Sequence, residues 1–184
     1  ALAKKSAAKP LTYGSVGVGS LYHLILENVQ AQTGIQLAHV PYKGNAPLLQ
    51  DIGGGQVDFA VLVYSAAMGA LAEQGRLKVT GQLGAQRSEL LKNVPTASEG
   101  QALKNFSYKI WTGFMVPKST PEDVVVKLHA AIGKALQDAG VRAQLAAQTQ
   151  HPSAPMTLAE SAKFFEAETA RYRAIAKQIN LQPQ

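Results

Sequence analysis

The first half of the chain alternates short apolar segments with helical patterns that end at glycines, and this alternation restricts the possible folds more than any other feature. Strands are predicted where apolar residues run together and stop at a glycine or proline, and helices where apolar residues recur with helical spacing. The predicted strands cover residues 11–14, 35–40, 57–63 and 77–83, and the predicted helices cover residues 20–32, 45–52 and 65–74. Such spacings are typical of parallel βαβ units, so an α/β fold is expected.

The pattern changes between residues 105 and 120, where a domain boundary is predicted. A short helix is expected at residues 95–103. An apolar run at residues 108–116, which contains Trp111, predicts a further strand that Pro117 ends. Beyond this run the chain is predicted to be mostly helical.

Three local signals define the helices of the second half. Thr120 is expected to cap a helix with Pro121 in its first position. Gly140 is expected to separate this helix from the next one, and Thr157 with Glu160 forms a capping-box pattern. The predicted helices are residues 120–136, 141–148 and 157–179.

Composition excludes several functional classes. The chain has 18 Lys+Arg, 12 Asp+Glu, a formal net charge of +6 and no Cys. The basic excess comes from three lysines in residues 1–9 and from nine basic against six acidic residues in 108–184, whereas residues 10–107 hold six of each. This distribution does not favour nucleic-acid binding, which needs basic residues gathered on one face. The lack of cysteine excludes a disulfide framework, a thiolate zinc site and a cysteine nucleophile. No apolar run reaches the roughly 18 to 20 residues of a membrane span.

The first candidate site is the glycine-rich segment between the first strand and the first helix, residues 13–20. Gly17 and Gly19 keep the backbone accessible, and Ser15 and Ser20 add hydroxyl groups. Backbone amides at the start of a helix attract anions, because the helix dipole is positive at that end. The segment therefore predicts an anion site, with a tight turn that binds nothing as the alternative.

An enzyme interpretation of the same segment has less support. The segment lacks the lysine of a Walker loop and the glycine order of the Rossmann pattern. A hydrolase triad would combine Ser15 or Ser20 with His23 and Asp58, but the G-x-S-x-G motif does not occur. His23 with Glu27 offers only two ligands where a stable metal site needs three or four. Neither a catalytic residue, a metal nor a cofactor is predicted.

A second candidate site follows the second predicted strand. Tyr42, Lys43 and Gly44 stand where this strand ends and the next helix begins. The carboxyl ends of parallel strands meet at one edge of the sheet, which is where open α/β sheets bind ligands. A phenol, an ammonium group and further amides are therefore expected beside the glycine-rich segment. The alternative is that Tyr42 packs in the interior and Lys43 is only solvated.

Two longer motifs contain these candidate residues. The first reads L-T-Y-G-S-x-G-x-G-S-x-x-H-L from Leu11 to Leu24, and the second reads H-V-P-Y-K-G-x-x-P-x-x-x-D-x-x-x-G-x-V-D from His39 to Asp58. Together they resemble the Bug/TctC family of periplasmic solute-binding proteins of tripartite tricarboxylate transporters. The resemblance extends over essentially the whole chain. Later positions that agree with it are Arg87, Val94, Pro95, Thr96, Glu99, Trp111, Gly113, Pro117, Thr120, Pro121, Arg171 and Tyr172.

The resemblance implies a non-enzymatic receptor that captures a small organic carboxylate in the periplasm and presents it to the permease subunits of the transporter. It also implies a periplasmic-binding-protein-like fold, with two α/β lobes around a cleft that closes about a hinge. The apolar residues 59–63, where members often have polar side chains, would contribute only shape. By similarity, the ligand-binding residues would be Ser15, Gly17, Gly19, Ser20, His23, Tyr42, Lys43 and Gly44.

Members of this family are longer, and the N-terminal part that builds most of their first lobe has no counterpart in this chain. The resemblance therefore implies a C-terminal portion: a flexible segment at 1–9, the second, ligand-loop lobe at 10–107, and at 108–184 the strand and helices of an incomplete first lobe. Half of a cleft that binds with about 8 kcal/mol leaves about 4 kcal/mol, which corresponds to a millimolar dissociation constant. An incomplete lobe also predicts exposed apolar surface and self-association.

Two further interpretations remain open on the sequence alone. One is an enzyme that acts on a phosphorylated or acyl substrate at the segment from Gly14 to Ser20. The other is a structural or regulatory α/β domain in which this segment binds no ligand.

Overall fold

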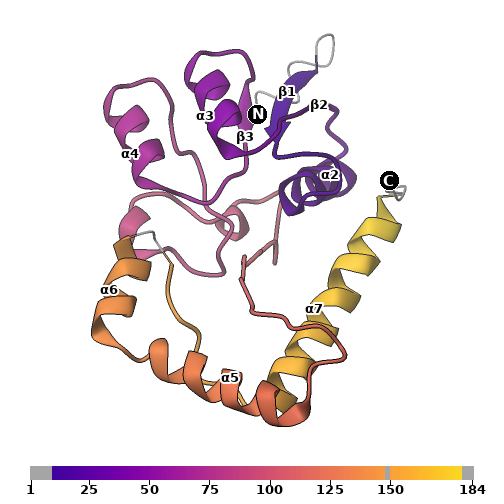
Figure 1. Ribbon diagram of the computed structural model, residues 1–184. Coiled ribbons are helices and arrows are strands. Elements are labelled where there is room, and N and C mark those ends of the chain that lie inside the picture. The colour runs from indigo at the N-terminus through magenta and orange to yellow at the C-terminus, as the bar shows by residue number, and fades with distance from the viewer. Residues whose placement is uncertain (1–9, 148–149, 180–184) are drawn as a thin grey trace. The chain divides into compact units, whose positions relative to one another are not determined.

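The computed structural model describes residues 10–147 and 150–179 (Figure 1). The chain divides into two compact units. One comprises the residues up to Ile110 together with those from Ala174 onward, and the other is Trp111–Arg173.

A three-stranded parallel sheet organises the first unit. Its strands are β1 (Leu11–Ser15), β2 (Leu37–Pro41) and β3 (Phe59–Ala60), in the order β2-β1-β3. The central position of β1 explains why its last three residues are buried. The parallel βαβ arrangement predicted from the alternating pattern is confirmed.

Three helices follow the three strands: α2 (Leu21–Thr33), α3 (Asn45–Gly53) and α4 (Ala66–Glu73). Ser20 caps α2 by accepting a hydrogen bond from the His23 amide, and Ser65 caps α4 in the same way. Asparagine is a common helix cap, and the sequence predicts Asn45 as the cap of α3, which is wrong. Asn45 is the first helical residue, and the cap is Gly44, which has a φ of 118°.

The strands predicted at residues 57–63 and 77–83 differ from the structure. Only Phe59 and Ala60 pair with β1, because Ala60 already lies opposite Gly14, and β1 ends one residue later at Ser15. The second run forms no strand; Gln82 makes an isolated bridge to Thr96. The Gln82 side chain binds the carbonyls of Leu91 and Val94 and the amide of Ser88, which holds this region in an irregular conformation that includes a 3-10 turn at Glu89–Leu91.

The helix predicted at residues 95–103 is reduced to a 3-10 turn at Ala97–Glu99. Thr96 and Glu99 form a capping box, but the cap after Glu99 is Gly100 in an extended conformation, which ends the turn. The predicted strand at residues 108–116 is also wrong. The apolar run favours a strand, but its Tyr108 amide bonds to the carbonyl of Leu83, which belongs to no strand, and no described residue of the run joins a ladder.

The second unit holds α5 (Glu122–Ala135), α6 (Ala139–Ala147) and most of α7 (Leu158–Gln178), as far as Arg173. The Thr157 and Glu160 capping box is confirmed by reciprocal hydrogen bonds. Two other predictions need correction. Pro121, rather than Thr120, caps α5. The break between α5 and α6 lies before Gly140, where the Asp138 carboxylate accepts from the first amides of α6.

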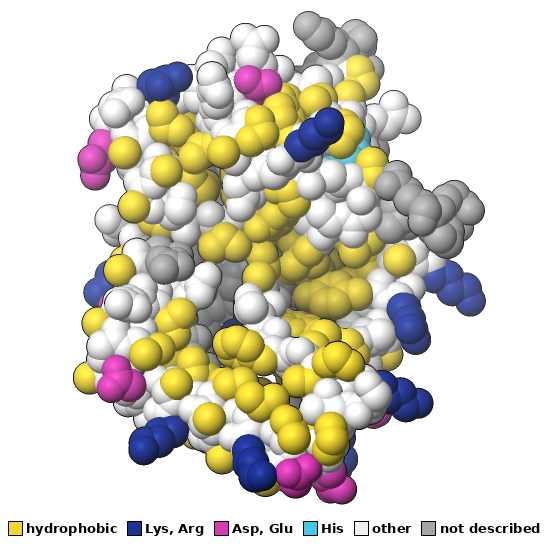
Figure 2. Space-filling model, in the orientation of Figure 1, with side chains coloured by type: hydrophobic (Ala, Val, Ile, Leu, Met, Phe, Trp, Pro, Cys, Tyr) yellow, Lys and Arg dark blue, Asp and Glu magenta, His cyan; other side chains and the backbone are white. Residues whose placement is uncertain are grey.

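The two units differ in how much apolar surface they bury. Every buried apolar side chain among the described residues belongs to the first unit: Tyr13, Leu24, Ile25, Leu26, Leu48, Val57, Phe106 and Tyr108. In the second unit, Trp111 packs edge-on against Phe164 and Phe165, yet both phenylalanines stay partly exposed. Apolar side chains are visible on the surface around α5 (Figure 2).

No helix in the described ranges combines the length and the apolar character that a membrane span requires.

Candidate functional site

Two segments that the sequence singles out meet at the carboxyl edge of the sheet. The glycine loop, residues 16–20, follows β1, and residues 42–44 follow β2. The Tyr42 amide donates to the Ser15 carbonyl at 2.8 Å, which joins the two segments directly. The local pattern that places them there is the parallel pairing of Ser15 with Pro41.

The glycines of the loop adopt backbone angles that other residues rarely take. Gly17 has a φ of 128° and Gly19 a φ of 78°. Their amides are engaged within the loop: Gly17 donates to Ser15 Oγ at 3.2 Å, and Gly19 donates to His23 Nδ1 at 3.1 Å. These two glycines therefore determine the shape of the loop.

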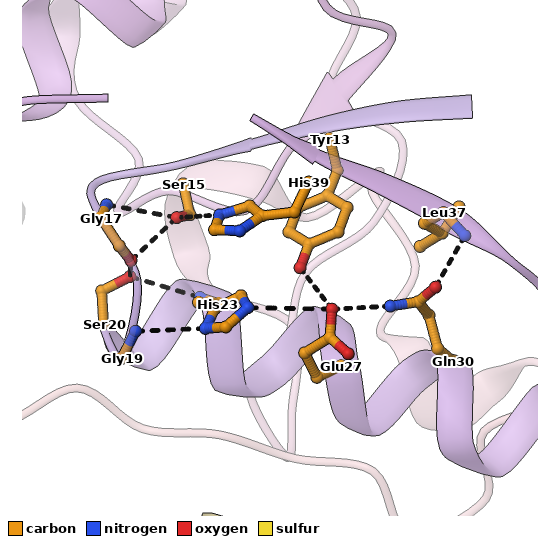
Figure 3. Close-up of polar contacts among 10 residues, drawn as sticks. All are labelled: Tyr13, Ser15, Gly17, Gly19, Ser20, His23, Glu27, Gln30, Leu37 and His39. Carbon is orange, nitrogen blue, oxygen red and sulfur yellow. Dashed lines mark hydrogen bonds and ion pairs between the residues drawn. The ribbon is translucent and has the colours of Figure 1, made fainter. Parts of the chain in front are cut away.

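The two serines also bond inside the loop (Figure 3). Ser15 is fully buried, and its Oγ lies 2.7 Å from His39 Nε2. Ser20 Oγ donates to the Gly17 carbonyl at 2.7 Å and accepts from the His23 amide at 3.3 Å. Ser15 therefore supports the loop from the interior, and Ser20 joins it to α2.

His39 is a residue of this region that the sequence reasoning did not select. Its ring stacks on Tyr13 and on His23, with centroid separations of 4.8 and 4.2 Å (Figure 3). The sequence offered one signal for His39, which is its place in the second motif. The importance of that place comes from the register of the two strands, in which His39 lies directly opposite Tyr13. A single sequence does not reveal that register by itself.

Glu27 anchors the stack from α2. Its Oε1 accepts from Tyr13 Oη at 2.6 Å and from Gln30 Nε2 at 2.7 Å, and it lies 3.8 Å from His23 Nε2. Burial and the hydrogen bond to Glu27 raise the pKa of Tyr13 far above its ordinary value. Burial lowers the pKa of His23, and Glu27 partly opposes this effect. Burial and the neighbouring His23 lower the pKa of His39.

Some donors at this edge remain available for a ligand. Among the described residues, none accepts a hydrogen bond from the amides of Val18, Leu21 and Tyr22. The last two open α2, where the helix dipole is positive. Lys43 is exposed on the neighbouring segment, whereas Tyr42 Oη donates to Asp51 at 2.9 Å. This arrangement is suited to an anion.

The same geometry does not provide catalytic groups. Ser15 and His39 form a serine–histidine pair, but the buried serine is closed to a substrate. Asp58, the third member of the imagined triad, accepts from the amide and hydroxyl of Thr12 instead. Across residues 10–147 and 150–179, no three His, Asp or Glu side chains gather in a way that could hold a metal ion.

A parallel α/β unit with a glycine loop at its carboxyl edge occurs in several classes of protein, and the solved structures that match this chain identify the periplasmic-binding-protein type. Solved structures of that type match this chain closely. Rpa4515 of R. palustris, solved with adipate, matches with a TM-score of 0.82 and 27% identity over 100% of this chain and 61% of its own. MatC from Rhodopseudomonas palustris, solved with bound malate, matches with a TM-score of 0.76 and 26% identity over 95% of this chain and 60% of its own.

The family model of the tripartite tricarboxylate transporter family receptor, TctC, matches residues 1–181, so the chain belongs to this family. Curated relatives agree. The UPF0065 protein of the tcbD-tcbE intergenic region of a Pseudomonas species is 33% identical over 93% of this chain and 50% of its own length. BugT of Bordetella pertussis is 31% identical over 83% of this chain and 47% of its own. The chain thus spans about half the length of these two relatives.

Proposed function

We propose that the chain is part of a periplasmic receptor that captures a small carboxylate and presents it to the permease subunits of a tripartite tricarboxylate transporter. The observation that carries this proposal is the position of the glycine loop in a chain of the TctC family. The loop opens α2 at the carboxyl edge of the sheet, with unengaged amides beside an exposed lysine. Charge-assisted hydrogen bonds from such donors contribute roughly 1.5 to 3 kcal/mol each.

The predicted site residues take two roles in this proposal. Ser15, Gly17, Gly19 and His23 hold the loop in shape through the hydrogen bonds between them. Ser20 caps the helix whose first amides face the carboxylate. Beside this loop, Lys43 supplies positive charge and Gly44 is the N-cap of α3. The hydrogen bond from Tyr42 to Asp51 fixes the position of the segment at residues 42–44.

The ligand class follows from the relatives and from the site. Two similar structures were solved with adipate and with malate, which are both dicarboxylates. A dicarboxylate has a second charged end, and the unengaged amides described above lie at one edge of one sheet, so we propose that a facing lobe completes the cleft. The residues from 108 onward would then belong to the incomplete part of that other lobe. A chain with one half of the contacts is expected to bind at millimolar concentration.

A titration followed by NMR tests the proposal. Adipate and malate are added to the labelled chain at constant ionic strength, with chloride as the reference salt. Saturable shifts at residues 16–22 and 42–44, with a millimolar dissociation constant, would support the proposed site. Shifts spread over the surface, or none at tens of millimolar, would count against ligand capture by this chain.

Two glycines form a matched pair for the same assay. Gly19 and Gly55 have φ angles of 78° and 74°, and an added Cβ meets nothing within 4 Å at either position. Alanine should therefore strain both backbones equally, by about 1 to 2 kcal/mol. Gly19→Ala is expected to weaken adipate binding at least about tenfold, whereas Gly55→Ala, at the end of α3, leaves it unchanged. Equal effects would remove the loop from the proposal.

A second copy of the chain is the proposed partner for the second unit when the chain is isolated. Phe114 is 77% exposed and Met115 is 68% exposed, and within this unit no described apolar side chain is buried. Apolar surface of this kind is normally covered by another protein surface. We propose that two chains associate through this surface, which light scattering can measure.

A further inference from the structure

The glycine loop depends on two histidines that lie outside it. We propose that His23 and His39 are positioning residues for ligand binding, and that the loop keeps its shape only while His23 Nδ1 carries no proton. This inference deepens the proposed function and rests on it for its effect on affinity. Its structural part concerns the ligand-free chain and is tested separately.

Each histidine holds one glycine of the loop. His23 Nδ1 accepts the Gly19 amide at 3.1 Å. His39 Nε2 lies 2.7 Å from Ser15 Oγ, which accepts the Gly17 amide at 3.2 Å. The rings stack with centroids 4.2 Å apart, so neither can turn without disturbing the other (Figure 3). Both positive-φ glycines are therefore fixed from the same pair of imidazoles.

The bond from Gly19 determines the tautomer of His23. A ring nitrogen accepts a hydrogen bond only when it carries no proton, so a neutral His23 has its proton on Nε2. Nε2 lies toward Glu27 Oε1, 3.8 Å away. A second proton would occupy Nδ1, where it faces the Gly19 N–H, and the bond that holds Gly19 would be lost.

The groups around the pair determine the direction of the pH effect. Glu27 approaches from α2, Tyr13 from β1 stacks on His39, and each histidine faces the other. Burial lowers the pKa of both histidines, while Glu27 partly opposes this. A lowered pKa means that the folded chain binds fewer protons than the unfolded chain. The loop is therefore expected to be intact at neutral pH and to loosen as the pH falls below the ordinary histidine value of about 6.5.

Hydrogen exchange of the Gly19 amide tests the positioning role without ligand. The protection factor is measured by NMR at neutral and at mildly acidic pH, with the Ile25 amide of α2 as an internal reference for folding. In the wild-type chain, Gly19 should lose at least about tenfold of its protection on acidification. His23→Asn places an amide oxygen near the position of Nδ1 and should keep protection at both pH values. His23→Leu should lack it at both.

Three results would overturn the inference. They are full Gly19 protection in His23→Leu at neutral pH, wild-type protection that does not change with pH, and an imidazole nitrogen spectrum that shows the Nδ1–H tautomer at neutral pH. The last measurement uses the wild-type chain alone, so it decides the question even where a variant does not fold.

Adipate titrations at the two pH values connect the loop to ligand binding. The wild-type dissociation constant should rise on acidification at least about fivefold, and the ratio in His23→Asn should stay near one. A pH-dependent Gly19 amide without adipate binding at either pH would count against the proposed function but not against the positioning role. Adipate binding with the same affinity at both pH values would count against the inference alone.

Discussion

Gly14 lies in the central strand directly against Leu48 of α3, and replacing it by alanine gives a direct test of the packing between β1 and α3. A Cβ at this position would lie 2.1 Å from Leu48 Cδ1 and 3.4 Å from Tyr42 Cε2. Carbon atoms pack at roughly 3.5 to 4.0 Å, so the new methyl overlaps Leu48 severely. Leu48 is 0% exposed, so its side chain is enclosed by neighbouring atoms.

The expected destabilisation is that of an overpacked core, about 1 to 3 kcal/mol. Gly14 is absent from the glycines with positive φ, so backbone strain adds nothing. In a chain of this size each kcal/mol lowers the melting temperature by about 2 to 4 °C. Urea unfolding followed by circular dichroism measures the change in the free energy of unfolding. Gly133→Ala is the matched control, because its Cβ meets nothing within 4 Å in α5, and it should stabilise the chain by up to about 1 kcal/mol.

A double-mutant cycle identifies the overlap with Leu48 as the cause. Leu48→Ala alone should cost about 2 to 5 kcal/mol through the cavity that it leaves. It also removes the atom that collides with the new methyl. The double variant should therefore be more stable than the sum of the single effects by about 1 kcal/mol or more. Strictly additive costs, or a Gly14→Ala chain as stable as the wild type, would refute the reasoning.

Three further outcomes follow from contacts in the structure. Tyr13→Phe keeps the packing but removes the hydrogen bond to Glu27, and urea unfolding should show a loss of about 1.5 to 3 kcal/mol. Hydrogen bonds from Arg87 and from the Thr96 amide lower the pKa of Glu99 to about 2, so their stabilisation is present above the unfolded value of 4.5 and lost as the pH falls toward 2. Unfolding of Glu99→Gln should therefore depend less on pH in that range. Phe114→Ser should reduce the average mass in light scattering if exposed apolar surface causes self-association.

A specific result would contradict each of these three predictions. Unchanged stability in Tyr13→Phe would mean that Glu27 does not depend on that hydroxyl. An unaltered acid profile in Glu99→Gln would remove the ion pair with Arg87 from the account of acid stability. The same mass for Phe114→Ser and wild type would place any association on a different surface. Lys118→Ser, an exposed change in the same unit, serves as the control in this last comparison.

Local sequence signals are sufficient to predict where a helix or strand begins or ends when contacts within a few residues determine that boundary. Thr157 and Glu160 form the predicted capping box, and the helices expected to begin at Ser20 and Ser65 do begin there, with these serines as caps, because a cap depends on hydrogen bonds within one helical turn. Gly34 ends α2 with a φ of 68°, and Gly75 follows α4 with a φ of 69°. The glycine-rich segment likewise revealed itself by composition, and the parallel α/β class followed from the alternation.

What the sequence could not determine is which backbone or side chain lies opposite another. The run at 108–116 has the pattern of a strand, but none of its residues belongs to one, and the Tyr108 amide bonds to the carbonyl of Leu83, which lies in no strand. The sequence analysis did not select His39, because the contacts that make it important come from other elements: Ser15 and Tyr13 of β1 and His23 of α2. The residue type shows which hydrogen bonds a side chain is able to make, but a bond forms only when two groups lie at the right distance. The register of β1 against β2 supplies that distance, and only the tertiary structure sets it.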